Sequence, residues 1–196
     1  MRRAYLGWIV FVGTIAIGIA LVCFTKVTQA QGYNADYSPF VGDYTGQVVI
    51  ATPGGLEKRD LDVSVRRESE GFSLEWSTEI QRPDGRIKSD RYFVAFKPVA
   101  SRPGSYLPTD KIDRFGKRFP INPLDGDPQL TAKIDGKSMY VYASLITDDG
   151  AHEVQTYERT LVPGGMKLKF SRVRNGEAIR GIEVDLKTKE QGIQLR

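Results

Sequence analysis

A period-two alternation of apolar and polar side chains runs through most of the chain from Phe40 onward. It is clearest at 61–66 and 72–80, where apolar residues at every second position are separated by charged or hydroxyl-bearing residues. Successive side chains of a β-strand point to opposite faces, so the pattern predicts strands with one buried and one solvated side. No stretch after Phe40 has a convincing helical period. The sequence therefore predicts an all-β domain.

Turn sequences rich in glycine, proline, asparagine and aspartate separate the alternating stretches. Consecutive strands joined by short turns form an antiparallel up-and-down meander, which must close into a barrel or fold into a sandwich to avoid unpaired edges. We expect about nine strands and favour a barrel over a sandwich. The predicted strands lie at 40–50, 61–66, 72–80, 86–97, 130–134, 138–147, 152–161, 166–173 and 177–186.

The last predicted hairpin allows a prediction of register. A two-residue turn at Asn175-Gly176 would place the apolar residues of its two strands on opposite faces. A three-residue loop, 174–176, places them on one face and sets Phe170 across from Arg180. We therefore predict the three-residue loop. It also brings Arg172 and Arg180 to the apolar side near the hairpin end.

The alternation stops between Pro98 and Pro128, a stretch that contains six prolines. We predict a long loop at 98–128, and loops of this length in compact domains are usually functional or disordered. Basic and aromatic residues mix in its centre, a composition that suits a membrane surface or an acidic partner. The alternative is a solvated loop whose phenylalanines pack on the barrel. The residues concerned are Lys111, Arg114, Phe115, Lys117, Arg118 and Phe119.

An uncharged apolar run, Ala4 to Phe24, follows Arg2 and Arg3. As a helix its 21 residues span roughly 31 Å, which matches the hydrocarbon core of a bilayer. The length favours an uncleaved single-pass anchor. A signal peptide cleaved after Ala30 is the alternative, because Thr28-Gln29-Ala30 resembles a cleavage site. The basic flank predicts a cytoplasmic N-terminus, an inner-membrane location and a periplasmic or otherwise extracytoplasmic domain.

Four regions follow from these patterns: an N-terminal membrane segment at 1–30, a linker at 31–39, the barrel domain at 40–190 and a tail at 191–196. Without the three basic residues of the first region, 25 basic residues face 24 acidic ones. A nearly neutral domain gives no support to nucleic-acid binding. The only cysteine lies in the apolar run, so we expect the domain to rely on its core rather than on disulfides.

The opening of the first strand, Phe40-Val41-Gly42-Asp43-Tyr44-Thr45-Gly46, together with the up-and-down order and a late inward arginine such as Arg180, resembles the lipocalin-like (calycin) barrels. The chain departs from that family by carrying Tyr44 where the opening Gly-x-Trp motif places tryptophan, and by having no disulfide. The resemblance covers most of 40–186. It implies an internal cavity for a small apolar ligand.

Two arginines on an apolar face are costly unless they find partners, and inside a barrel they could grip a ligand carboxylate. They could equally lie at the rim or pair with an internal acid. Aromatic residues could line the same pocket or simply fill the core. The candidate ligand-binding residues are Arg172, Arg180, Trp76, Tyr142 and Tyr157.

Catalytic and metal-binding patterns find little support. His152 is the sole histidine, and its neighbour Glu153 should point to the opposite face of the strand. One histidine without cysteines is a poor set of transition-metal ligands. We therefore predict no catalytic residues, no metal and no cofactor.

Two non-catalytic functions remain open. The first is a membrane-anchored accessory or interaction subunit of an inner-membrane complex, of respiratory or photosynthetic type, that contacts a protein partner through the 98–128 segment. The second is a lipocalin-like binder of a small apolar or carboxylate-bearing ligand. An enzyme is the least favoured function.

Overall fold

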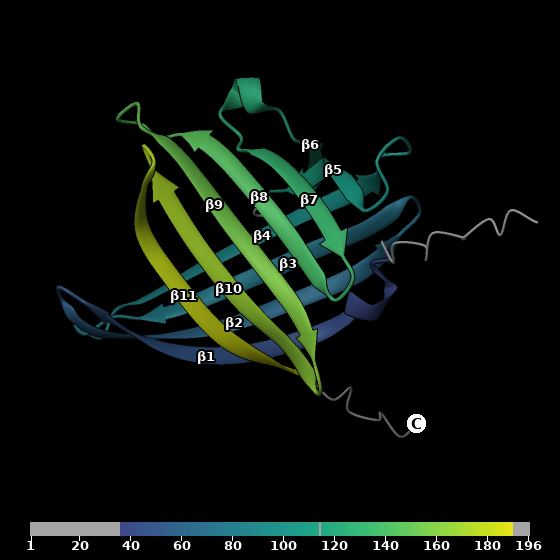
Figure 1. Cartoon of the computed structure of the whole chain (residues 1–196). Helices are drawn as coiled ribbons and strands as arrows, with labels where there is room; N and C mark the ends of the chain where they lie inside the picture. Colours follow the sequence, from purple (N-terminus) through teal and green to yellow (C-terminus); the bar gives the residue numbers. More distant parts are fainter. Residues whose placement is uncertain (1–35, 114, 190–196) are drawn as a thin grey trace, which may run out of the picture. The chain divides into compact units, whose positions relative to one another are not determined.

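The computed structural model describes residues 36–113 and 115–189, which form one antiparallel sheet closed into a barrel (Figure 1). The strand order is β4-β3-β2-β1-β11-β10-β9-β8-β7-β5-β6, and β4 also pairs with β5, so ten strands form the ring and β6 extends from β5. The elements are η1 (Ser38–Phe40), β1 (Gly42–Thr52), β2 (Gly55–Glu68), β3 (Gly71–Gln81), β4 (Ile87–Pro98), β5 (Ser105–Ile112), β6 (Arg118–Pro120), η2 (Pro123–Asp125), β7 (Gln129–Asp135), β8 (Ser138–Ile146), β9 (His152–Val162), β10 (Gly165–Arg174) and β11 (Glu177–Thr188).

The all-β, antiparallel, closed up-and-down barrel is confirmed, and all nine predicted strands are present. Strands β5 and β6 were not predicted, because they lie in the segment interpreted as a long loop, 98–128. Proline residues in this segment argue against strands in the sequence. Pro108 nevertheless lies inside β5, opposite Phe96 of β4, and Pro120 ends β6. The β4–β5 ladder has a register shift between Val94 and Phe96, and an irregular ladder tolerates a residue without a backbone N–H.

The predicted register of the last hairpin is wrong. Arg174 pairs with Glu177, so the turn has two residues, and Asn175 and Gly176 have φ angles of 47° and 86°. A bulge just beyond the turn shifts the register, and Phe170 then lies opposite Ile182 rather than Arg180. The bulge brings the apolar residues of both strands to one face, which the three-residue loop was expected to do.

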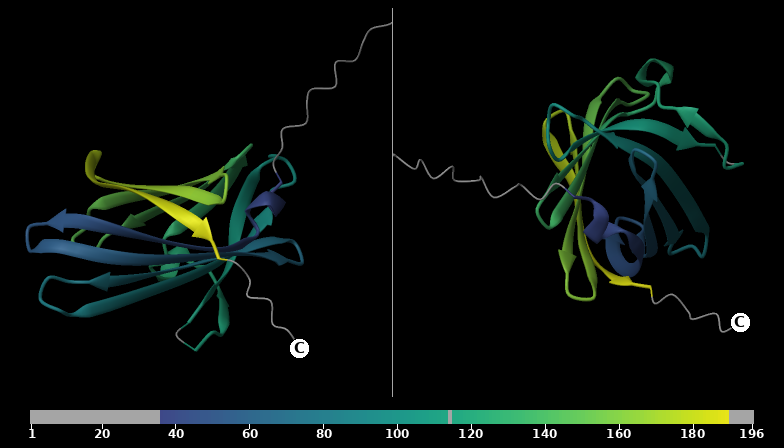
Figure 2. Two further views of the ribbon diagram at one scale, coloured as in Figure 1. Left: turned by 90° about the horizontal axis from the view of Figure 1, so that it is seen from below. Right: turned by 90° about the vertical axis from the view of Figure 1, so that its right-hand side faces the viewer.

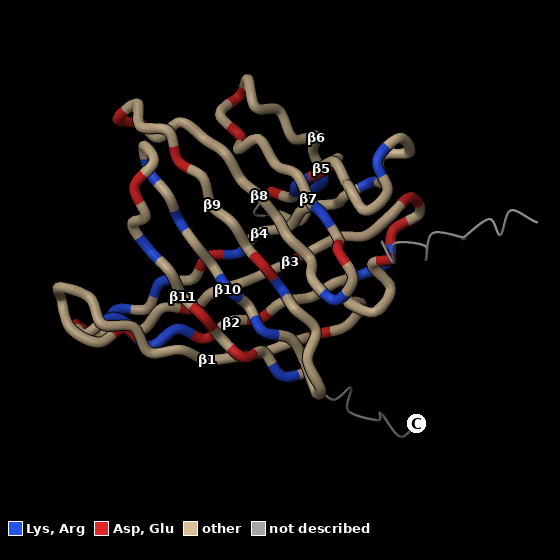
Figure 3. Tube along the Cα trace, viewed as in Figure 1, with Lys and Arg blue, Asp and Glu red and all other residues tan. Residues whose placement is uncertain are grey.

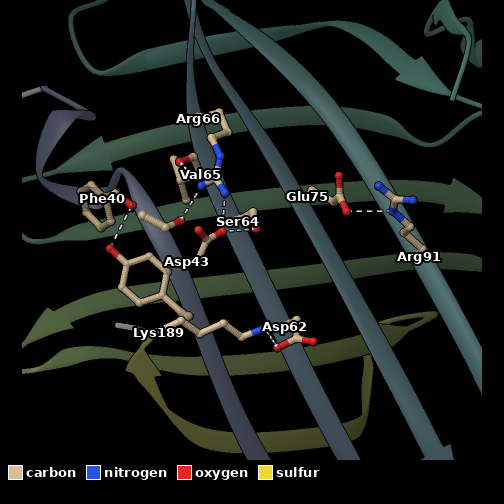
Figure 4. Close-up of polar contacts among 11 residues, drawn as sticks. Phe40, Asp43, Asp62, Ser64, Val65, Arg66, Glu75, Arg91 and Lys189 are labelled. Atoms are coloured by element: carbon tan, nitrogen blue, oxygen red, sulfur yellow. Dashed lines mark hydrogen bonds and ion pairs between the residues drawn. The ribbon is translucent and has the colours of Figure 1, made fainter. Parts of the chain in front are cut away.

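One end of the barrel is closed by a packed core. Phe40, in η1, is fully buried there, although η1 lies partly in the predicted linker. Tyr44 Oη donates a hydrogen bond to the Phe40 backbone oxygen at 3.0 Å (Figure 4). Around Phe40 the strands contribute buried side chains that include Phe72, Phe96, Ile134, Met139, Met166 and Leu186.

At the other end the barrel opens. The β1–β11 ladder contains only Tyr44–Thr188 and Thr45–Lys187, after which the two strands diverge toward their hairpins (Figures 1 and 2). Close approach of β11 requires a glycine on β1, since a Cβ at Gly46 would lie 2.6 Å from the Asp185 backbone oxygen. The interior is therefore reached between the β1–β4 side and the β9–β11 side of the sheet.

Charged residues of both signs are interspersed along the strands (Figure 3). Many of them are paired: Asp43 accepts hydrogen bonds from Ser64 and Arg66, Glu75 from Arg91, and Asp62 forms an ion pair with Lys189 (Figure 4).

No helix within 36–113 or 115–189 has the length and apolar character needed to span a bilayer. The predicted anchor, Ala4 to Phe24, lies outside the described residues, as do the predicted cleavage site and the tail at 191–196. These assignments stay predictions.

Candidate ligand-binding interior

The barrel contains two cavities toward its open end. The first has a volume of about 150 Å³ and lies between β1–β4 and β9–β11. The second has a volume of about 390 Å³ and lies between β4–β5 and β7–β9. Val63, Leu168, Phe170 and Ile182 are among the apolar residues of the first cavity. The second is lined mainly by apolar side chains, among them Val94, Ile112, Ile121, Leu130, Val141 and Ala143.

An aromatic cluster separates the two cavities. Trp76 stacks on Tyr92 with ring centroids 5.3 Å apart and an interplanar angle of 23°. Tyr157 lies 5.6 Å from Trp76 on one side and 4.9 Å from Phe170 on the other. Trp76, Tyr92 and Tyr157 line both cavities, so an occupant of either one would contact this cluster.

Arg159 lies in the wall of the first cavity and is only 1% exposed. Its Cζ is 5.8 Å from the Trp76 ring centroid and 5.5 Å from that of Tyr157, which gives two cation–π contacts. Among the described residues, nothing accepts a hydrogen bond from its Nε or Nη1. Burial lowers the pKa of Arg159 to about 10, so the guanidinium is still protonated at neutral pH.

The inward-facing residues of β9 form a polar stripe that leads from the open end to Arg159. Glu153 is fully buried and forms an ion pair with Arg172 of β10. Gln155 Nε2 donates to Glu153 Oε1 at 2.6 Å, and Tyr157 Oη donates to Gln155 Oε1 at 2.8 Å. The hydrogen bond from Arg172 holds the pKa of Glu153 below its ordinary value. Burial raises the pKa of Tyr157 to about 12, so its hydroxyl stays neutral.

A second arginine, Arg59 of β2, also lines the first cavity. Its Nη2 pairs with Glu57 at 2.8 Å, although its Nε has no acceptor among the described residues. Within 36–113 and 115–189 the two arginines of this cavity therefore differ, since Arg59 has a carboxylate partner and Arg159 has none.

The predicted ligand-binding residues separate into three groups. Trp76 and Tyr157 do line the interior cavities. Arg172 points inward, but its guanidinium is engaged by Glu153, while Arg180 is exposed close to the β10–β11 turn. Tyr142 is on the outer face, stacked on Tyr140 and 37% exposed, and it lines neither of the two cavities. Alternation along β8 already placed it opposite Met139, Val141 and Ala143.

Arg159 was missed by the sequence analysis. The signal was present, because Glu153, Tyr157 and Arg159 share the odd positions of one strand. Period two alone did not show that this odd face was the inner one, since the even face carries polar residues as well. The expected opposition of His152 and Glu153 is confirmed: His152 is exposed and lies 2.9 Å from Ser144 Oγ, whereas Glu153 is buried.

The basic segment predicted to contact a membrane or partner is partly neutralised. Lys111 pairs with Asp127, and Arg118 binds both oxygens of Glu68 at 2.8 and 3.1 Å. Lys117 lies over the ring of Phe119, which is 37% exposed, and Phe115 is 79% exposed. Arg114 lies outside the described residues.

Across 36–113 and 115–189, no group of three His, Cys, Asp or Glu side chains is arranged to hold a metal ion. No protein-family model, no curated protein and no solved structure matches the chain.

Proposed function

We propose that this protein is a non-catalytic binding protein that holds a small apolar molecule inside its barrel. The observation that supports the proposal is the pair of interior cavities, about 150 and 390 Å³, that meet at the Trp76–Tyr92–Tyr157 cluster. Ligand sites are typically concave, mostly apolar and supplied with a few oriented polar groups, as this interior is. Membership of the lipocalin-like barrels would agree with this function, and we include that membership in the proposal.

Filling the second cavity tests the proposal. Ala143 is 6% exposed and lines that cavity, so Ala143→Trp should occupy the space a ligand needs. With N-phenyl-1-naphthylamine, a neutral apolar fluorescent probe, we expect saturable binding by the full chain. We expect the Ala143→Trp variant to bind the probe at least about tenfold more weakly, a change of about 1.4 kcal/mol.

Thr131→Trp is the matched control, because Thr131 is exposed on the outer face of the neighbouring strand β7. It adds the same side chain without entering the cavity and should bind the probe as the parent does. Absence of saturable probe binding by the parent chain, or equal binding by Ala143→Trp, would contradict the proposal.

We further propose that the barrel is tethered to the inner membrane on its extracytoplasmic side, on the strength of the uncharged run Ala4 to Phe24 in the sequence. An accessory role toward a partner at that membrane is a second candidate function. It is favoured by Phe115, which is 79% exposed beside the basic residues of the β5–β6 connection. Large exposed aromatic residues are enriched at protein interfaces.

The accessory role predicts that partner recovery depends on Phe115. In a mild-detergent pull-down with the full chain, Phe115→Ser should recover much less of any co-purifying membrane protein. Leu124→Ser is the control, since Leu124 of η2 is 94% exposed and equally apolar. Equal recovery by the parent chain and both variants would remove the β5–β6 connection as the contact.

A further inference from the structure

The buried Nε and Nη1 of Arg159, which have no acceptor among the described residues, require a physical explanation. A buried cation without a hydrogen-bonded partner is strongly disfavoured, and buried polar groups in native proteins are almost always satisfied. The other inward arginines described above follow this rule in part, because Arg172 pairs with Glu153 and Arg59 with Glu57. Arg159 has aromatic contacts, but no oxygen within the described residues accepts from its Nε or Nη1.

Within the part of the chain that the structure describes, the inward carboxylate of β9 and the two acids of the cavity wall already have partners. Glu153 is engaged by Arg172 and Gln155. Asp90 of β4 pairs with Lys88 at 2.7 Å, and Asp62 of β2 pairs with Lys189 at 2.7 Å. Since these carboxylates have their own partners, a molecule in the cavity can supply the acceptor that suits Arg159.

The chemistry of the site selects a single carboxylate. A guanidinium and a carboxylate form two parallel charge-assisted hydrogen bonds, and one carboxylate balances one unpaired cation. A dianionic phosphate would want a second free cation, and the other arginine of this cavity, Arg59, is already paired. The rest of the wall is mostly apolar, with Leu168, Phe170 and Ile182 near the aromatic cluster. It also contains Ser77 and Thr78 and the paired acids Asp62 and Asp90. A cavity of about 150 Å³ has room for roughly one ring.

We propose that Arg159 receives the carboxylate of a small monocarboxylic acid whose apolar body lies against Trp76 and Tyr157. This inference rests on the proposed function, because it names the ligand class of the same interior. It adds a residue that recognises the ligand's charge, and it gives the first cavity a role distinct from that of the larger second cavity.

A matched pair of probes tests the inference: 3-phenylpropanoate and 3-phenylpropan-1-ol, which differ in the carboxylate. Binding of each to the full chain at neutral pH is measured by isothermal titration calorimetry. We expect the acid to bind at least about tenfold more tightly than the alcohol. The Arg159→Met variant should bind the acid at least about tenfold more weakly than the parent chain, while its binding of the alcohol should change little. Arg159→Lys should keep part of the preference, since lysine offers a charge without the planar fork.

Lys169→Met is the matched control, because Lys169 lies on the outer face of β10 and is exposed. It removes one positive charge from the chain without touching the cavity, so the preference for the acid should persist. Binding of the neutral N-phenyl-1-naphthylamine to Arg159→Met reports that the variant is folded with its cavities intact. If Arg159→Met fails this check, Arg159→Lys takes its place because it keeps the charge. A reduced preference for the acid in Arg159→Lys supports the role of Arg159, and an unchanged preference contradicts it.

The outcomes separate the two proposals. Neutral-probe binding by the parent chain without any preference for the acid would overturn the role of Arg159 and leave the proposed function standing. A preference for the acid that survives in Arg159→Met would also overturn the role of Arg159. Failure of the parent chain to bind the neutral probe, the acid or the alcohol would overturn both proposals together.

Discussion

The Arg172→Met variant is expected to lose about 1–3 kcal/mol of unfolding free energy at neutral pH, because it leaves the buried Glu153 without its cation. Solvent reaches about a third of the Arg172 side chain and screens the pair, which keeps the loss below that for a fully buried ion pair. Glu153 would keep only the hydrogen bond from Gln155. The loss is measured by urea unfolding of the full chain, followed by circular dichroism. Arg66→Met is the matched control, since Arg66 pairs with Asp43 on the outer face and is half-exposed, so its loss should cost less than about 1 kcal/mol.

The pH dependence of this loss has a definite sign. In the parent chain the hydrogen bond from Arg172 depresses the pKa of Glu153, so its stabilisation is present above the unfolded pKa and disappears as the pH falls through the folded pKa. Without Arg172 the largest cause of this depression is lost, while the hydrogen bond from Gln155 and the charge of Arg174 still oppose burial. The variant therefore forfeits the part of the stabilisation that Arg172 supplies above the unfolded pKa of about 4.3. The difference between parent and variant should shrink from neutral pH toward pH of about 4.

Arg159→Met is expected to change stability in the opposite direction. Replacing a buried charge by an apolar side chain of similar length removes its desolvation penalty, and related replacements stabilise proteins by about 1–4 kcal/mol. The variant forfeits two cation–π contacts, to Trp76 and Tyr157, which keeps the gain modest. The same urea titration on ligand-free full chain measures the change.

A loss of stability in Arg159→Met of the size expected for Arg172→Met would mean that the Arg159 guanidinium has an acceptor in the folded chain.

The double variant Glu153→Gln with Arg172→Met gives an independent test of the prediction for Arg172→Met. Because it removes both charges of the inner pair, it should recover much of the stability that Arg172→Met alone loses.

Much of the fold could be predicted from alternation, since the spacing of Leu61, Val63 and Val65 indicates both a strand and its inner face. Alternation has no means of detecting an extra residue in a strand, and the bulge after Asn175-Gly176 therefore led to the wrong register. Proline was a second source of error. Pro108 argues against a strand, yet β5 accommodates it because the β4–β5 ladder is irregular at that point.

The candidate site was predicted only in part, for a related reason. Trp76 and Tyr157 were recognised because large aromatic residues stand out in any strand. Arg159 did not stand out, because on β9 both faces carry polar residues and only the closed ring decides which face is inside. The pairing of Arg172 with Glu153 joins β10 to β9, and such a partner becomes visible only once the two strands are in register.

The narrow seam between β1 and β11 has a consequence for biosynthesis. The ring is joined by its first and last strands, so the sheet cannot be completed until β11 has left the ribosome. Until then β1 presents an unpaired edge, and exposed edges invite aggregation. Chains that lack β11 should therefore aggregate more readily than the completed barrel.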